Sequence, residues 1–179
     1  MNKYCNHLNL DFPLFKENVD VNQFKQVYHT RGDVAIHLHP ALLDFLNSIN
    51  LQVTHLEMFY SKPEFKQKIH IDNTGNECVK INYVFGGANS IMNWYTIKDN
   101  IVPTIKETRI GTKYISCAED EVNLVHQSVV KFPSLIQVGV PHNIINSSED
   151  RLCVSLMLSR NKIHITMNEA LTIFKPYII

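Results

Sequence analysis

The stretch Arg151-Leu152-Cys153-Val154-Ser155-Leu156-Met157-Leu158-Ser159 alternates strictly between two kinds of side chain. In a β-strand, successive side chains point to opposite faces, so the leucines and the valine share one face. The other face carries an arginine, a cysteine, two serines and a methionine. We predict that the leucine face packs under a covering layer and that the mixed face lines the inside of a barrel that holds a polar ligand.

The same period of two recurs through most of the chain after Gln52, with many β-branched and aromatic residues. Turn-forming sequences such as Gly86-Gly87-Ala88-Asn89 separate most of these runs. The candidate strands cover residues 52–60, 67–73, 78–85, 90–97, 112–117, 122–130, 134–139, 142–146 and 151–159. Many short strands with few helices predict a mainly β protein, a double-stranded β-helix (jelly-roll) of two facing sheets.

The two ends of the chain differ from this barrel core, which we place at residues 52–160. Residues 1–50 have mixed character: a short edge strand is expected at 11–15, a helical turn or two at 22–28, and a helix at 40–46 that starts with a proline. We expect the 40–46 helix to cover the leucine face. In the C-terminal segment 166–179, Thr166-Met167-Asn168-Glu169 resembles a capping box that opens a helix over 169–174.

The composition is that of an ordinary soluble protein. With 179 residues and 45% hydrophobic residues, the chain is expected to form a single domain with a substantial core. The formal net charge is zero, which indicates neither a nucleic-acid partner nor an anionic membrane. Four scattered cysteines without a CxxC pair, no signal peptide and no membrane-spanning run favour a cytoplasmic protein with reduced thiols.

The candidate metal ligands lie in Lys68-Ile69-His70-Ile71-Asp72-Asn73. On a strand, His70 and Asp72 point to the same side and place two metal-binding groups next to each other. A third candidate, His142, follows far downstream in Val140-Pro141-His142-Asn143. Two histidines and one carboxylate suit Fe(II) and leave coordination positions open for other molecules.

One His-x-Asp motif alone is weak evidence, because His37-x-His39 and His55-x-Glu57 have the same spacing. The simpler interpretation of each is a solvated or hydrogen-bonded polar face of a strand. The His70 motif differs in that it ends a strand beside a turn, where sites are commonly built. It is also followed, in order, by His142 and Arg151.

The order of motifs resembles that of the iron(II)/2-oxoglutarate-dependent oxygenases, and most closely their small aspartyl/asparaginyl β-hydroxylase-like branch in bacteria and phages. The resemblance covers roughly residues 52–160, and the first 50 residues carry none of it. The family fold is the double-stranded β-helix that the strand pattern also predicts. The motifs that carry the resemblance are His70-Ile71-Asp72, Lys80-Ile81-Asn82-Tyr83, Asn93-Trp94-Tyr95, Pro141-His142-Asn143-Ile144-Ile145-Asn146 and Arg151.

The resemblance implies that His70, Asp72 and His142 bind Fe(II) and that 2-oxoglutarate and O2 are co-substrates. Arg151 would bind the distal carboxylate of 2-oxoglutarate, for which a planar guanidinium is well suited. Asn82 and Ser155 would face the same interior. Two simpler alternatives remain: Arg151 pairs with an acid of the preceding Glu149-Asp150 turn, and Asn82 forms only a cross-strand hydrogen bond.

Several other residues have two interpretations. Trp94 could line the substrate entrance, but a core position is expected; Tyr60 and Tyr83 could donate to a bound carboxylate or simply pack. His55 and Glu57 are expected near the site on a neighbouring strand. Cys78, Cys117 and Cys153 are expected to fill the core.

The resemblance implies a hydroxylase that converts an unactivated C–H bond to an alcohol and releases succinate and CO2. A cupin-like isomerase or binding module with another metal is an alternative, since fold does not fix function. A non-catalytic jelly-roll that binds a partner is a third. The substrate, a small molecule or a residue within a peptide, and the oligomeric state cannot be read from the sequence.

Overall fold

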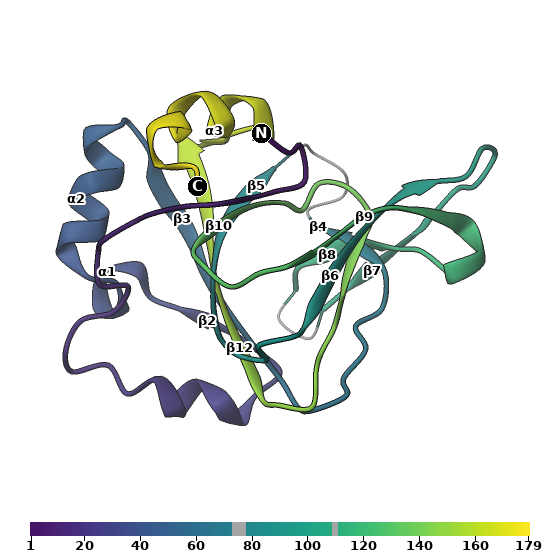
Figure 1. Cartoon of the computed structure of the whole chain (residues 1–179), viewed down its shortest axis with the longest axis horizontal. Helices are drawn as coiled ribbons and strands as arrows, with labels where there is room; N and C mark the ends of the chain where they lie inside the picture. The colour runs from purple at the N-terminus through teal and green to yellow at the C-terminus, as the bar shows by residue number, and fades with distance from the viewer. Residues whose placement is uncertain (73–77, 109–110) are drawn as a thin grey trace.

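Two antiparallel sheets face each other in the computed structural model, which describes residues 1–72, 78–108 and 111–179 (Figure 1). Within these residues, the first sheet has the strand order β1-β10-β5-β12-β3-β2, and β13 also pairs with β12. The second sheet has the order β7-β8-β4-β11-β6-β9. Consecutive strands alternate between the sheets along much of the chain, so the predicted mainly β, double-stranded β-helix fold is confirmed.

The strands of the first sheet are β1 (Cys5–His7), β2 (His29–Gly32), β3 (Gln52–Ser61), β5 (Val79–Gly86), β10 (Ser134–Gln137), β12 (Arg151–Arg160) and β13 (Ile163–His164). Those of the second are β4 (His70–Asp72), β6 (Ile91–Ile97), β7 (Thr104–Glu107), β8 (Lys113–Ser116), β9 (Val122–Val129) and β11 (His142–Ile145). The helices are α1 (Val34–His37), α2 (Pro40–Ser48) and α3 (Met167–Ile173), with 3-10 helices η1 (Val21–Gln26), η3 (Glu119–Glu121) and η4 (Lys175–Tyr177).

Strand β12 is central in the first sheet and has the two faces that its sequence predicts. The leucine face packs against Leu42 and Leu46 of α2, and all of these side chains belong to one buried cluster. Helix α3 adds Met167 and Ala170 to the same layer. Burying such side chains contributes roughly 1.5–3 kcal/mol each, so this apolar layer is a main source of stability. Helices α2 and α3 therefore lie on the outer side of the first sheet, away from the second sheet (Figure 1).

The inward face of β12 looks into the space between the sheets. One part of this space is filled by an apolar cluster around Trp94, which is fully buried and donates its indole N–H to the backbone oxygen of Gln137. Trp94 is thus a core residue, as expected. The other part is polar and contains the candidate site.

The terminal segments differ in part from the prediction. The capping box is confirmed, since Thr166 and Glu169 exchange backbone and side-chain hydrogen bonds at the start of α3. The predicted edge strand over 11–15 is wrong: only Phe15 forms an isolated bridge, with Leu38. Strand β2 was not predicted, and its pairing with β3 brings the N-terminal part of the chain to the sheet edge.

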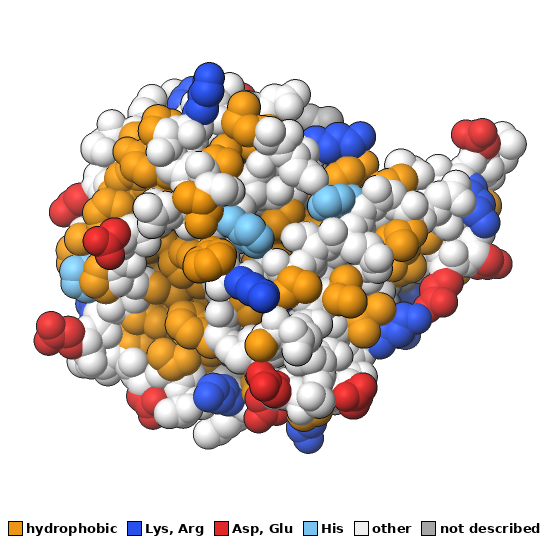
Figure 2. Space-filling view, in the orientation of Figure 1, with side chains coloured by type: hydrophobic (Ala, Val, Ile, Leu, Met, Phe, Trp, Pro, Cys, Tyr) orange, Lys and Arg blue, Asp and Glu red, His pale blue; other side chains and the backbone are white. Residues whose placement is uncertain are grey.

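Predicted strand 67–73 is shorter in the structure, with β4 limited to His70–Asp72. The turn expected at 73–76 lies outside the described residues, and the prediction of one domain over 1–179 stays a prediction. None of the helices among the described residues is long and apolar enough to cross a bilayer. In the view of Figure 2, hydrophobic side chains gather on the side of the molecule where α1 and α2 lie, with acidic and basic side chains scattered around them.

Candidate metal centre

His70, Asp72 and His142 meet at the inner face of the second sheet. His70 and Asp72 are the two ends of β4, and His142 begins β11, where it lies opposite His70 in the antiparallel register. One potential ligand atom from each residue lies within 4.8 Å of those of the other two. Strand alternation places the first two on one side, and strand pairing adds the third.

The tautomer of both histidines suits metal binding. Nδ1 of His70 lies 2.9 Å from the backbone oxygen of Lys68, and Nδ1 of His142 lies 2.9 Å from that of Val140. A carbonyl oxygen only accepts hydrogen bonds, so each Nδ1 carries a proton and Nε2 is the nitrogen through which each ring can bind a cation. Such a hydrogen bond on the far nitrogen is typical of metal-binding histidines.

The spacing and charges of these groups also fit a divalent cation. His70 Nε2 lies 3.4 Å from Asp72 Oδ1, while neighbouring donors bound about 2.1 Å from an octahedral ion lie about 3 Å apart. Burial lowers the pKa of His142 to about 4, so its imidazole is neutral at pH 7. Burial alone would raise the pKa of Asp72, but the charge of Lys80 is the main influence that holds it well below its ordinary value.

Lys80 is a central residue of the site that sequence reasoning did not assign a role. Its Nζ lies 2.7 Å from Asp72 Oδ2 and 2.9 Å from Glu57 Oε2, and the side chain is almost fully buried. Burial alone lowers the pKa of Lys80, but the two carboxylates outweigh it and raise the pKa, so the ammonium is charged. The sequence feature that could have identified it is a lysine on the inward face of an otherwise apolar strand, the same face that carries Asn82.

Glu57 completes this ionic cluster from β3. Burial alone raises its pKa, but the neighbouring His29 ring and Lys80 outweigh it and bring the pKa to about 2. His29 Nε2 lies 3.4 Å from Glu57 Oε1, which is too long for a well-aligned hydrogen bond, so the contact is electrostatic. Of the expected pair, Glu57 therefore reaches the site, whereas His55 is exposed and approaches His164 instead.

Arg151 lies on the inward face of β12 and is only 3% exposed. Among the described residues, no carboxylate lies within 4.0 Å of its guanidinium, so it pairs neither with Glu149 nor with Asp150. A buried arginine without a carboxylate partner is unusual, because an uncompensated charge is costly in the interior.

Asn82 and Ser155 lie side by side on the neighbouring strands β5 and β12. The Ser155 hydroxyl donates to Asn82 Oδ1 over 2.6 Å, and both residues are buried. The cross-strand hydrogen bond considered for Asn82 therefore exists, and both side chains also line the same inner cavity as Arg151. Cys153 lines that cavity too, so it is more than the core filler that was expected.

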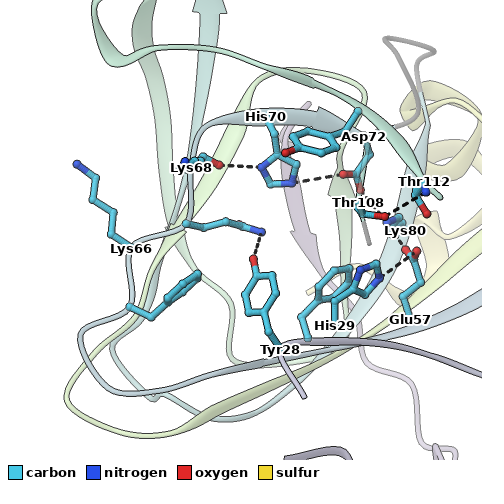
Figure 3. A pocket seen from close by; sticks show the side chains of 14 residues that line it. Tyr28, His29, Glu57, Lys66, Lys68, His70, Asp72, Lys80, Thr108 and Thr112 are labelled. Atoms are coloured by element: carbon cyan, nitrogen blue, oxygen red, sulfur yellow. Dashed lines mark hydrogen bonds and ion pairs between the residues drawn. The ribbon is translucent and has the colours of Figure 1, made fainter. Parts of the chain in front are cut away.

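Two adjoining cavities meet at the candidate ligands. The inner cavity has a volume of about 50 Å³ and reaches Arg151, Asn82, Ser155 and His142. The outer cavity has a volume of about 340 Å³ and is lined by four aromatic rings and several polar groups (Figure 3). The residues that line both cavities are Tyr28, Phe59, Gln67, His70, Asp72 and Lys80.

The N-terminal segment supplies part of the outer cavity, although its sequence carries no recognised motif. Tyr28 and His29 face His70 across this cavity (Figure 3). The Tyr28 hydroxyl accepts a hydrogen bond from Gln67 Nε2 over 3.2 Å, and the His29 ring stacks on Phe59. Tyr60 and Tyr83, in contrast, pack in the apolar layer between the first sheet and its helices, and they do not face the site.

Comparisons with known proteins add little to this picture. No protein-family model and no curated protein sequence matches the chain. One similar solved structure is described as "Structural and spectroscopic insights into the mechanism of oxalate oxidase"; it is 12% identical, and the match covers 96% of this chain and 88% of that chain with a TM-score of 0.33. A likeness of this size supports no inference about activity, which depends on the site itself.

Proposed function

We propose that the protein is a non-haem Fe(II)- and 2-oxoglutarate-dependent dioxygenase. It hydroxylates a C–H bond of a small molecule or an amino-acid residue and releases succinate and CO2. His70, Asp72 and His142 would hold the iron, and the bound iron with 2-oxoglutarate and O2 would supply the oxidising chemistry. One oxygen atom enters the product and the other enters succinate.

The observation that carries the proposal is the buried Arg151, which has no carboxylate partner in the part of the chain that the structure describes and faces the same interior as the three proposed metal ligands. A guanidinium in this setting favours an anion that arrives from outside, and a carboxylate matches its paired N–H groups. A metal site alone would not require such a group.

The charges of the buried groups agree with a dianionic co-substrate. Asp72 and Glu57 are negative, Lys80 and Arg151 are positive, and His142 is neutral. These side chains therefore balance one another before any ligand binds. A divalent cation adds two positive charges, which the two carboxylates of 2-oxoglutarate would neutralise.

The remaining residues have binding roles in this proposal. Asn82 and Ser155 offer polar groups to an anion in the inner cavity next to Arg151. The substrate would occupy the outer cavity, whose walls include Tyr28, Phe59 and Phe65. Aromatic walls exclude water from the reacting C–H bond and protect the protein from uncoupled oxidation.

An anaerobic titration tests this proposal. Metal-free protein is mixed with Fe(II) and then with 2-oxoglutarate, and the visible charge-transfer band of an iron-chelated keto acid is recorded. We expect the band to appear with about one equivalent of each. If the protein binds iron but neither binds 2-oxoglutarate nor shows the band, the proposal is overturned in favour of a cupin-like metal protein. Absence of metal binding would favour a non-catalytic jelly-roll.

A further inference from the structure

The two oxygens of Asp72 have different surroundings. Oδ2 lies 2.7 Å from the ammonium of Lys80, a distance typical of a charge-assisted hydrogen bond. Oδ1 lies 3.4 Å from Nε2 of His70, on the side where the potential metal ligands converge. Oδ1 is therefore the oxygen on the side of the potential metal ligands, while Oδ2 is bound to Lys80.

Lys80 is held in place from its other side. Its Nζ also contacts Glu57 Oε2 over 2.9 Å, and the lysine is 4% exposed. Lys80 lies on β5 and Glu57 on β3, both in the first sheet, whereas Asp72 lies on β4 in the second sheet. The cluster thus fixes the carboxylate of one sheet from the opposite sheet, and the buried pairing keeps the lysine from turning away.

We propose that Lys80 is a positioning residue that restricts Asp72 to a single metal-facing oxygen, Oδ1. An unrestrained carboxylate can bind a cation through both oxygens, which occupies one more coordination position. By holding Oδ2, Lys80 keeps that position open for a chelating co-substrate. Glu57 holds the ammonium of Lys80 from its other side. This inference rests on the proposed function, because it assumes that Asp72 is a metal ligand.

The test compares three variants. Lys80→Met removes the ammonium at similar length, and it is combined with Glu57→Gln so that Glu57 is not left as a buried acid without its cation. Glu57→Gln alone keeps Lys80 on Asp72, and Lys131→Met makes the same change at an exposed lysine away from the site. Dissociation constants are measured anaerobically for Fe(II), and then for 2-oxoglutarate with Fe(II) bound.

The double variant should bind Fe(II) as tightly as the wild type or more tightly, because Asp72 gains its second oxygen as a donor. Its affinity for 2-oxoglutarate should fall by about tenfold or more, the scale seen when groups that orient metal ligands are lost. Lys131→Met should keep both affinities within about threefold of the wild type, whereas Glu57→Gln should lose less 2-oxoglutarate affinity than the double variant, because Lys80 stays on Asp72. A merely structural role predicts parallel loss of both affinities, and that result, or unchanged 2-oxoglutarate affinity, would overturn the inference.

Co(II) gives a readout that does not depend on 2-oxoglutarate. A second carboxylate oxygen on the ion either displaces a bound water or raises the coordination number, so the visible spectrum of the Co(II)-loaded double variant should differ from that of the loaded wild type in band position or intensity. Equal spectra would contradict the inference even if the oxygenase proposal holds. Conversely, a wild type that binds no 2-oxoglutarate refutes the oxygenase proposal, while the Co(II) comparison still decides the role of Lys80.

Discussion

His142 lies directly opposite His70 across the β4–β11 strand pair, and the centres of their rings are 4.4 Å apart. The two residues are far apart in the chain, yet each donates through Nδ1 to the backbone oxygen two positions before it. Nε2 of each histidine is thereby left to face the same cation.

The single variants His142→Ala and His70→Ala should each weaken Fe(II) binding by more than about 100-fold. Loss of a ligand costs more affinity than loss of a residue that only orients a ligand. Anaerobic titration with a competing chelator measures this loss. His55→Ala, which removes an exposed histidine outside both cavities, is the control and should bind Fe(II) normally. Normal Fe(II) binding by His142→Ala would refute the ligand assignment.

Arg151→Lys should reduce the affinity for 2-oxoglutarate by roughly 10- to 100-fold while leaving Fe(II) affinity unchanged. The lysine keeps the charge but loses the paired donors, and a hydrogen bond to a charged group contributes about 1.5–3 kcal/mol. Isothermal titration with iron-loaded protein measures both quantities. Arg160→Lys, near the other end of β12, is the matched control; an equal effect there would remove the specific role of Arg151.

Gly87→Ala should displace the side chain of Arg151 by contact with its Cβ. Gly87 has φ +60°, and an added Cβ would lie 2.8 Å from the Cβ of Arg151 and 2.6 Å from the Ser90 hydroxyl. Arg151 would have to shift, so we expect about a tenfold loss of 2-oxoglutarate affinity, in addition to roughly 1–2 kcal/mol of backbone strain. Gly111→Ala carries similar strain at φ +79° without such a contact. The two variants should therefore lose similar stability from strain but differ in 2-oxoglutarate binding.

The ionised Glu57 should stabilise the fold in a pH-dependent way. Its pKa is about 2 in the folded protein against an ordinary value of 4.5, so its stabilising contribution is complete above pH 4.5 and is lost as the pH falls towards 2. Urea denaturation of the wild type and of Glu57→Gln measures this. The difference in their free energies of unfolding should shrink on acidification below pH 4.5; a constant difference from pH 7 to pH 3 would contradict the assigned contacts.

Leu156→Ala should destabilise the protein by about 2–5 kcal/mol, because the side chain is fully buried between the first sheet and its helices. Metal affinity should not change, since this face of β12 points away from the site. Thermal unfolding and Fe(II) titration test the two halves of the prediction. Leu124→Ala, at a position that is 52% exposed, should cost little.

Some of this molecule could be read from local sequence alone. The alternation in 151–159 identified both faces of β12 and the need for a covering helix, and the spacing of His70 and Asp72 placed them on one side of a strand. The capping box gave the start of α3 within two residues. These features depend on backbone geometry over a few residues, which the sequence encodes directly.

Other features depend on which strands become neighbours. Nothing near Lys80 in the sequence indicates that Glu57 and Asp72 enclose it, because the three residues come from three strands in two sheets. Likewise, Tyr28 reaches the outer cavity only because β2 pairs with β3 at the sheet edge. Strand order and register are set by the packing of whole sheets, so the tertiary structure alone decided which charges meet and where the cavities lie.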